Sequence, residues 1–255
     1  MKALVRLRPW TRALSVVLLC IGAPAAALAD AAADAALEAK ILDVIRQHPK
    51  EIIEAVAGYQ RQQAEARMRS AEEQLRARVE KLDRTELLGD SPARGGPDGK
   101  LVLVEFSDFQ CPYCKRAFKT VQNFMQAHGN EVRLVYKHLP LSDMHPEAGN
   151  AALAAWAAHQ QGKFWEYHDK LFAAPEQLGE AYYVGVAKDL GLDLKKFDQD
   201  RNSAAARQAI DADVGLAGRL GIDATPQFLL NGLPITGAAP PEEFEKALAR
   251  AKQAL

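Results

Sequence analysis

Cysteine is scarce in this chain: it occurs at three of the 255 positions, residues 20, 111 and 114. So few cysteines exclude a small scaffold held together by many disulfides. An excess of charge of one sign is also lacking, because 32 basic residues face 33 acidic ones. The chain therefore has no overall basic field, and we expect no nucleic-acid partner. With 48% hydrophobic residues, core-forming side chains are not depleted, which excludes wholesale disorder.

A short uncharged stretch near the N-terminus is typical of a secretory signal. Residues 13–29 carry no charge and end in Ala-Leu-Ala, the small-x-small pattern that signal peptidase cleaves, after four basic residues at positions 2, 6, 8 and 12. This layout predicts a cleavable signal peptide over residues 1–29. An uncleaved anchor is the alternative, which the shortness of the apolar run disfavours.

Cleavage after residue 29 would change both the charge and the cysteine count. The predicted signal peptide holds four of the 32 basic residues and none of the 33 acidic ones. The mature chain would therefore carry 28 basic and 33 acidic residues, a net charge of −5. Cys20 would leave as well, and only Cys111 and Cys114 would remain. A pair this close in sequence closes too small a loop to stabilise a fold by chain entropy. We therefore predict that the pair performs chemistry.

Two segments precede the main domain. Residues 30–60 carry apolar side chains at helical spacing, and Pro49 fits the first turn of a second helix. Two short amphipathic helices cannot bury these side chains alone, so they need the main domain or copies of themselves. Residues 61–92 alternate basic and acidic side chains, which predicts a charged helical linker, with a weak coiled coil between protomers as the alternative. Pro and Gly over residues 91–99 mark a domain boundary.

The next segment has a strand, helix, strand pattern. Residues 101–106 form a continuous apolar run with one carboxylate, typical of a buried central strand. A helix is predicted from Cys111 to about His128, and a second strand over 131–138, so this segment is a βαβ unit.

Helical patterns dominate the remaining sequence. Residues 146–220 are predicted to be helical throughout. Two strands, 227–230 and 233–236, meet at Asn231-Gly232, a strong hairpin turn. A last helix is predicted to start at Pro240-Pro241.

Cys111 and Cys114 stand between the predicted strand and helix of the βαβ unit. A structural zinc site needs four ligands, and the sequence offers no second cysteine pair and only six scattered histidines, so zinc is disfavoured. A CxxC at this place is typical of a redox pair. Helix N-terminal N–H groups and the helix dipole stabilise an anion, which lowers the pKa of Cys111 below its usual value of about 8.5. Cys111 is therefore the predicted nucleophile and Cys114 the resolving thiol.

The residues between and after the cysteines contribute to the predicted site. Pro112 has no N–H and stiffens the turn, and Tyr113 completes the dipeptide between the two thiols. Lys115 and Arg116 either add positive potential or are ordinary solvated charges.

Glu105 is the carboxylate inside the apolar run. Burial of a carboxylate is costly unless the group is neutral or partnered. Because Glu105 lies six residues before Cys111, we predict that it sits beneath the pair and exchanges a proton with Cys114. A side chain that points to the strand edge is the alternative.

The sequence FSDFQCPYC at residues 106–114, the distant Thr225-Pro226 and the hairpin that follows resemble the DsbA-type thioredoxin-fold family of bacterial thiol–disulfide proteins. The resemblance covers residues from about 100 to 255. It implies an α/β thioredoxin fold over residues 93–255, with an inserted helical domain at about 146–220. The segments before it would be an N-terminal oligomerisation and linker region.

The resemblance also implies how the site works. Thr225-Pro226 would be cis and face the cysteines, so that a substrate strand pairs beside the disulfide. The redox-active Cys111–Cys114 disulfide would serve without any other cofactor. The location would be the periplasm.

Within that family, the Pro-Tyr dipeptide and Thr225 resemble the ScsC (suppressor of copper sensitivity) and DsbG members more than the DsbA oxidase, which carries Pro-His and has Val before its cis-proline. The N-terminal segment resembles that of the trimeric form of ScsC. This resemblance implies a homo-oligomer, with a trimer favoured, that acts as a disulfide isomerase or reductase on unfolded or misdisulfided secreted proteins. A DsbD-like membrane reductase would keep it reduced.

Two other functions stay open at this point. The first is a monomeric dithiol oxidase that a DsbB-like quinone enzyme reoxidises. The second is a copper-tolerance protein in which Cys111 and Cys114 bind Cu(I), because soft thiolates suit that ion.

Overall fold

The computed structural model describes residues 25–96 and 99–255, and the chain divides into two compact units, the first ending at Ala64 and the second starting at Glu65. The first unit contains helix α1 (Ala25–Gln47) and the beginning of helix α2 (Pro49–Val79). Pro49 opens α2, as the sequence predicts. The predicted signal peptide falls mostly on residues 1–24, which lie outside the described residues. Among the residues that are described, no helix combines the length and apolar character needed to cross a membrane.

The second unit is built on a five-stranded mixed sheet with the order β1-β3-β2-β4-β5. β2 and β3 are parallel, and the other neighbours are antiparallel. β2 is central and every one of its residues is buried, which explains its continuous apolar sequence. The strands are β1 (Ala93–Gly95), β2 (Leu101–Ser107), β3 (Val132–His138), β4 (Gln227–Leu230) and β5 (Leu233–Thr236).

The sequence predicts four of these strands and misses β1. Residues 91–99 contain several Pro and Gly residues, which locally favour a turn. Pairing with β3 nevertheless places Ala93 opposite Val135 and Gly95 opposite Arg133. Tertiary pairing therefore overrides the local preference in this three-residue strand.

Helices cover both faces of the sheet. On one face, α4 (Pro112–His128) and α10 (Pro241–Gln253) bury Val121, Phe124 and Phe244 against Leu103 and other side chains of the sheet. On the opposite face, the C-terminal part of α9 (Ala204–Leu220) packs on side chains of β2, including Val104. Odd- and even-numbered residues of β2 thus serve opposite faces, as the pleat of a strand requires.

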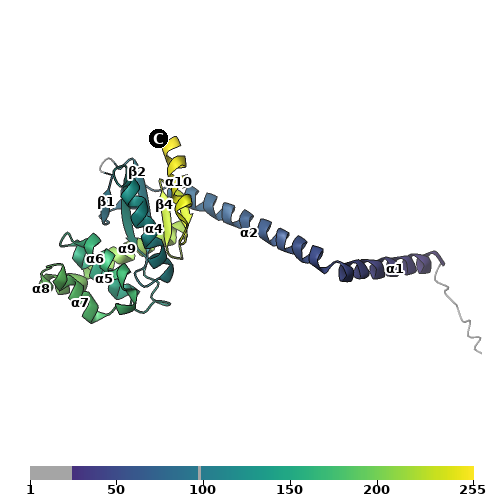
Figure 1. The fold of residues 1–255 in the computed structure, drawn as a ribbon, viewed down its shortest axis with the longest axis horizontal. Helices are drawn as coiled ribbons and strands as arrows, with labels where there is room; N and C mark the ends of the chain where they lie inside the picture. The colour runs from purple at the N-terminus through teal and green to yellow at the C-terminus, as the bar shows by residue number, and fades with distance from the viewer. Residues whose placement is uncertain (1–24, 97–98) are drawn as a thin grey trace, which may run out of the picture. The chain divides into compact units, whose positions relative to one another are not determined.

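Helices α5 to α8 follow β3 in the chain and precede α9 and β4. They lie together at one end of the sheet (Figure 1). Seven alanines of α5 are buried, and their small side chains allow neighbouring helices to approach closely. The sequence predicts a helical segment here, but it does not single out α8. The elements are α5 (Ala148–His159), α6 (Phe164–Ala173), the 3₁₀ turn η1 (Pro175–Gln177), α7 (Glu180–Asp189) and α8 (Leu194–Arg201).

Part of the predicted charged linker packs on the sheet. Val79 at the end of α2 is buried in the same cluster as α9, and Leu75 and Leu82 pack against it. Arg78 donates a hydrogen bond from Nη1 to the Leu220 carbonyl oxygen at 2.8 Å. The short helix α3 (Arg84–Leu88) follows, with Asp83 as its N-cap. From Leu75 onward this segment therefore packs on the core of the thioredoxin-like unit.

Candidate active site

Cys111 is the N-cap residue of α4, directly after the loop that leaves β2. Pro112 occupies the first helical position, where its missing N–H costs nothing and its fixed φ suits the helix. In the thiol form, Cys111 Sγ donates a weak hydrogen bond to the Thr225 carbonyl oxygen at 3.5 Å. Only 4% of the residue's surface is exposed, so little of it is accessible to solvent.

The pKa of the Cys111 thiol is lowered from its ordinary value of 9.0 to about 5. The largest cause is a hydrogen bond from the neighbouring Cys114 thiol, and the Thr225 side chain and the backbone N–H groups of Cys114 and Tyr113 add to it. Burial acts in the opposite direction but is outweighed. Cys111 is therefore a thiolate at neutral pH, which is the reactive form of cysteine.

Cys114 has the opposite character. It is fully buried one turn further along α4, and burial together with the neighbouring Cys111 raises the pKa of its thiol far above the ordinary range. Both residues are free thiols in this structure. The pair consists of an activated thiolate and a shielded thiol that needs a base before it can attack.

Glu105 lies on β2 on the face toward α4, two residues before Ser107. It is 2% exposed, and burial raises the pKa of its carboxyl from 4.5 to about 7, while the Ser107 and Arg94 side chains lower it by smaller amounts. A carboxyl group with this pKa exchanges protons readily near neutral pH. Its backbone pairs with Tyr136 of β3 and Phe228 of β4, so Glu105 sits in the interior of the sheet and not at an edge.

The peptide bond between Thr225 and Pro226 is cis and immediately precedes β4. Thr225 is 9% exposed, and its carbonyl oxygen is the partner of Cys111 described above. Residues separated by more than a hundred positions in the sequence thus meet at Cys111.

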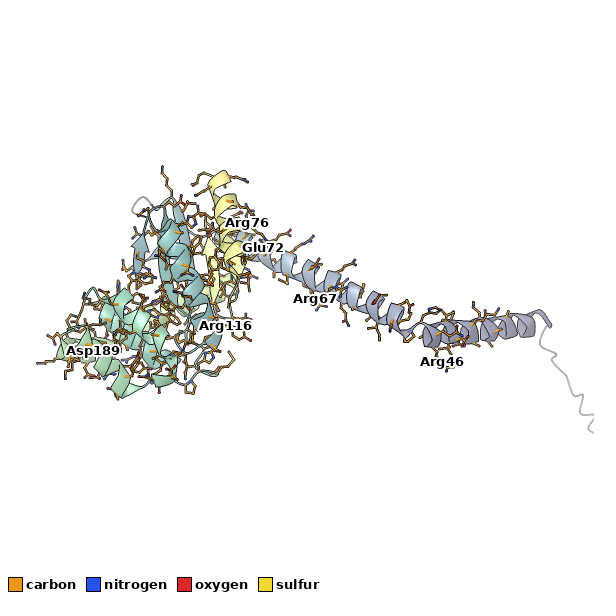
Figure 2. All side chains as sticks on the ribbon, in the orientation of Figure 1. Arg46, Arg67, Glu72, Arg76, Arg116 and Asp189 are labelled. Carbon is orange, nitrogen blue, oxygen red and sulfur yellow. The ribbon has the colours of Figure 1, made fainter. Side chains whose placement is uncertain are left out.

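Three side chains beside the cysteines face solvent. Tyr113 is 54% exposed, and the Arg116 guanidinium lies 4.3 Å from the centre of its ring. Arg116 projects from the beginning of α4 (Figure 2). Lys115 forms an ion pair with Glu176 at 3.5 Å, so its charge is directed toward the helical insertion.

Sequence reasoning missed a group of buried polar side chains around Glu105 and Tyr136. Within the described part of the chain, several of their atoms have no hydrogen-bond partner: Arg94 Nε, Ser107 Oγ, Tyr136 OH, His138 Nδ1 and Nε2, and His168 Nε2. Burial lowers the pKa of His138 to about 3, so its ring is neutral at physiological pH. The sequence does not indicate Arg94, because β1 has no strand signal, and it presents the histidines only as scattered residues that are poor zinc ligands.

A family model described as a DSBA-like thioredoxin domain matches residues 102–249. The chain belongs to this family. The match begins in β2 and ends in α10, so the DSBA-like domain includes the cysteines, the helical insertion and the cis-proline. The predicted family resemblance and the thioredoxin fold with its helical insertion are thereby confirmed.

Solved structures agree with this assignment. A thioredoxin-like oxidoreductase from Silicibacter pomeroyi DSS-3 is 33% identical, with a TM-score of 0.63, and covers 68% of this chain and 100% of that chain. ScsC from Proteus mirabilis in a transitional conformation is 23% identical, with a TM-score of 0.61, and covers 88% of this chain and 99% of that one. A periplasmic thioredoxin-like protein from Salmonella enterica serovar Typhimurium is 22% identical, with a TM-score of 0.58, over 67% and 98% of the two chains. The last two support the DSBA-like fold alone.

The DSBA-like chain is also similar to part of larger curated proteins. The Na(+)/H(+) antiporter NhaA 3 of Salinispora tropica is 40% identical over 139 residues, and NhaA of Herminiimonas arsenicoxydans is 36% identical over 145 residues. These matches cover 54% and 57% of this chain but 21% and 23% of the antiporters. The chain thus spans about a fifth of the length of the curated relatives that it matches.

Proposed function

We propose that this protein is a periplasmic thiol–disulfide oxidoreductase that exchanges disulfides with secreted proteins through Cys111 and Cys114. The observation that carries the proposal is the opposite state of the two thiols: the pKa of Cys111 is about 5, and that of Cys114 is raised. A thiolate is both a good nucleophile and a good leaving group, and the protonated neighbouring thiol can resolve the mixed disulfide that forms.

Reduction of a client disulfide then proceeds in two exchanges. The Cys111 thiolate attacks one client sulfur, which forms a mixed disulfide and releases the other client sulfur as a thiolate. The Cys114 thiol gives its proton to the ionised Glu105 carboxyl and attacks Cys111 Sγ. This step forms the Cys111–Cys114 disulfide and releases the second client sulfur as a thiolate, so the protein loses the two electrons that the client gains. The same steps in reverse oxidise a client dithiol.

Thr225 and Pro226 are proposed to hold the client. The Thr225 carbonyl oxygen lies 3.5 Å from Cys111 Sγ, so an extended client segment that pairs with this backbone would lie beside the reacting sulfur. Tyr113 and Arg116, which are exposed beside Cys111, would contact the same client segment. No cofactor other than the cysteine pair is proposed.

We further propose that the protein works as an oligomeric isomerase or reductase, with a trimer favoured. The first unit exposes apolar side chains, including Ile41, Ile45 and Ile53. The apolar face of a helix is normally buried against another helix or a domain. Association through these side chains would gather several Cys111 thiolates around one client, which favours repeated rearrangement of wrong disulfides. A DsbD-like membrane reductase would supply the electrons that keep the pair reduced.

The test removes residues 30–60 and measures mass in solution together with reactivation of scrambled ribonuclease. We expect the full chain to be an oligomer with isomerase activity, and the truncated chain to be a monomer that retains dithiol oxidation. An unchanged mass after truncation would reject the oligomer, and no reactivation by either form would reject the isomerase.

The runner-up is a monomeric oxidase that a DsbB-like enzyme reoxidises. A strongly stabilised thiolate favours the reduced form and makes the disulfide oxidising, which suits this function as well. The redox state of the pair in cells decides between them, because an oxidase is held as the disulfide and an isomerase as the dithiol. A Cu(I) site is less well supported, since the raised pKa of Cys114 opposes a second thiolate; anaerobic Cu(I) titration of the wild type against Cys111→Ser tests it.

A further inference from the structure

The residues just before Cys111 are tied to the loop that leads into the helical insertion. The Leu139 N–H donates to the Ser107 carbonyl oxygen at 3.0 Å, and the Glu147 N–H donates to Gln110 Oε1 at 2.7 Å. The cysteine loop and the insertion are therefore joined by hydrogen bonds at both ends of residues 107–110.

Asp108 lies at the centre of this connection. Its side chain is 0% exposed. Oδ1 accepts a hydrogen bond from the Gln110 N–H at 2.8 Å, and Oδ2 accepts from the Leu141 N–H at 3.0 Å and from His145 Nδ1 at 2.7 Å. The Asp108 carbonyl oxygen accepts the Cys111 N–H at 3.2 Å. Asp108 thus fixes the backbone of the nucleophile on one side and the insertion loop on the other.

The connection between Asp108 and Cys111 is one of geometry. The groups that shift the pKa of Cys111 are Cys114, Thr225 and Tyr113, together with burial. Asp108 is joined to Cys111 through the backbone hydrogen bond between its carbonyl oxygen and the Cys111 N–H. A role for Asp108 in the site therefore comes from the hydrogen bonds that hold this loop in place.

We propose that Asp108 and His145 are positioning residues that hold the N-terminus of α4 in the arrangement that stabilises the Cys111 thiolate. The proposal rests on the thiol–disulfide exchange proposed above. His145 donates to an oxygen that has no access to water, so its loss leaves a buried acceptor short of a partner. The loop then relaxes, and the N–H groups at the start of α4 are no longer fixed toward Cys111 Sγ.

The experiment measures the rate of Cys111 alkylation against pH in the reduced full chain. His145→Ala removes the donor, and His145→Asn retains one at the place of Nδ1. We expect His145→Ala to raise the midpoint of this rate–pH profile by about one pH unit. Alkylation at pH 5 would then be slower by about fivefold, and the rate at pH 9 would be unchanged. We expect His145→Asn to restore the wild-type profile.

His128→Ala is the matched control. His128 is 22% exposed, close to the 18% of His145, and binds carboxylates of Glu131 and Glu245 at the other end of α4. Its profile should match that of the wild type. An equal shift in this variant would show that any loosening of α4 has the same effect, which would overturn the proposal.

Asp108→Asn separates positioning from charge. If Asp108 acts mainly through its charge, removal of that charge lowers the midpoint of Cys111 alkylation; if it positions the loop, the midpoint rises. A lower midpoint would overturn the proposal. If His145→Ala does not fold by circular dichroism, His145→Leu, which fills the space without a donor, replaces it with the same expected shift.

The two proposals fail in different ways. A wild-type midpoint near the ordinary value of 9.0 would reject the reactive Cys111 itself. A wild-type midpoint near 5 that His145→Ala leaves unchanged would reject only the positioning role.

Discussion

Cys111 and Cys114 are the same residue type one helical turn apart, yet their thiols have opposite pKa shifts. Cys111 receives hydrogen bonds that stabilise its anion, and Cys114 is buried against the sheet. The proposed order of attack follows from this asymmetry: the residue with the stabilised thiolate reacts first, and the other requires a base. We propose that Glu105, whose carboxyl is buried and has a pKa of about 7, is that base.

Glu105→Gln tests this assignment. We expect resolution of a mixed disulfide between Cys111 and thionitrobenzoate to slow by about 100-fold, because general base catalysis is lost. In the wild type, resolution should accelerate as pH rises through about 7, where Glu105 ionises. Stopped-flow absorbance of the released thiol measures both.

Tyr136→Phe is the control for that experiment, because Tyr136 pairs with Glu105 across the strands but carries no carboxyl group. Its resolution rate should remain within about threefold of the wild type, since no proton acceptor is lost. Resolution by Glu105→Gln at the wild-type rate would contradict a base role.

The pKa of Cys111 also predicts how the stability of the reduced protein depends on pH. Because folding lowers this pKa from 9.0 to about 5, the thiolate stabilises the folded state fully above pH 9, and this contribution is lost as pH falls through 5. The difference in unfolding free energy between wild type and Cys111→Ser should therefore grow from pH 5 to pH 9. Urea unfolding under reducing conditions measures it; a constant difference would argue against a lowered pKa.

At the scale of elements, β3 and α9 are connected by a buried ion pair. Lys137 Nζ lies 3.1 Å from Asp213 Oδ1, and Asp213 Oδ2 accepts the His138 N–H at 2.9 Å. Burial raises the pKa of Asp213 in spite of Lys137, so the carboxylate depends on its partners. This pair fixes the last helix of the insertion to the sheet that carries Glu105.

Lys137→Met should destabilise the fold by about 3 kcal/mol, because it leaves the buried Asp213 carboxylate without its cation. The double variant Lys137→Met/Asp213→Leu should regain most of that loss, since neither charge is then buried. Urea unfolding of both variants gives the comparison. A double variant less stable than Lys137→Met would show that the pair itself contributes more than its burial costs.

At the scale of the whole molecule, the proposed oligomer depends on apolar side chains of the first unit. Ile45 and Ile53 are 42% and 67% exposed, and a charge at either place would be buried in an association of helices at high cost. The double variant Ile45→Asp/Ile53→Asp should therefore lower the mass in solution to that of a monomer, as measured by light scattering (Figure 2 shows the helices that carry these positions).

Leu194→Asp/Val214→Asp is the matched control, because both residues are 39% exposed but lie on the thioredoxin-like unit. Its mass should equal that of the wild type. If both double variants remain oligomers, the association does not use these helices.

The sequence alone determined the elements with strong local signals. The apolar run of β2, the Asn231-Gly232 hairpin and Pro49 at the start of α2 each follow from side-chain pattern or backbone restriction within a few residues. The Cys-Pro-Tyr-Cys sequence after a strand likewise indicated the pair that the structure places at the N-terminus of α4.

Tertiary structure alone decided what depends on distant pairing. β1 forms because it pairs with β3, and α2 packs on the domain core from Leu75 because its apolar side chains contact those of α9. The convergence of Thr225 on Cys111, and of His145 on Asp108, has the same origin. Local propensity carries no information about which segments meet, whereas a pKa is set by burial and by the groups that meet there.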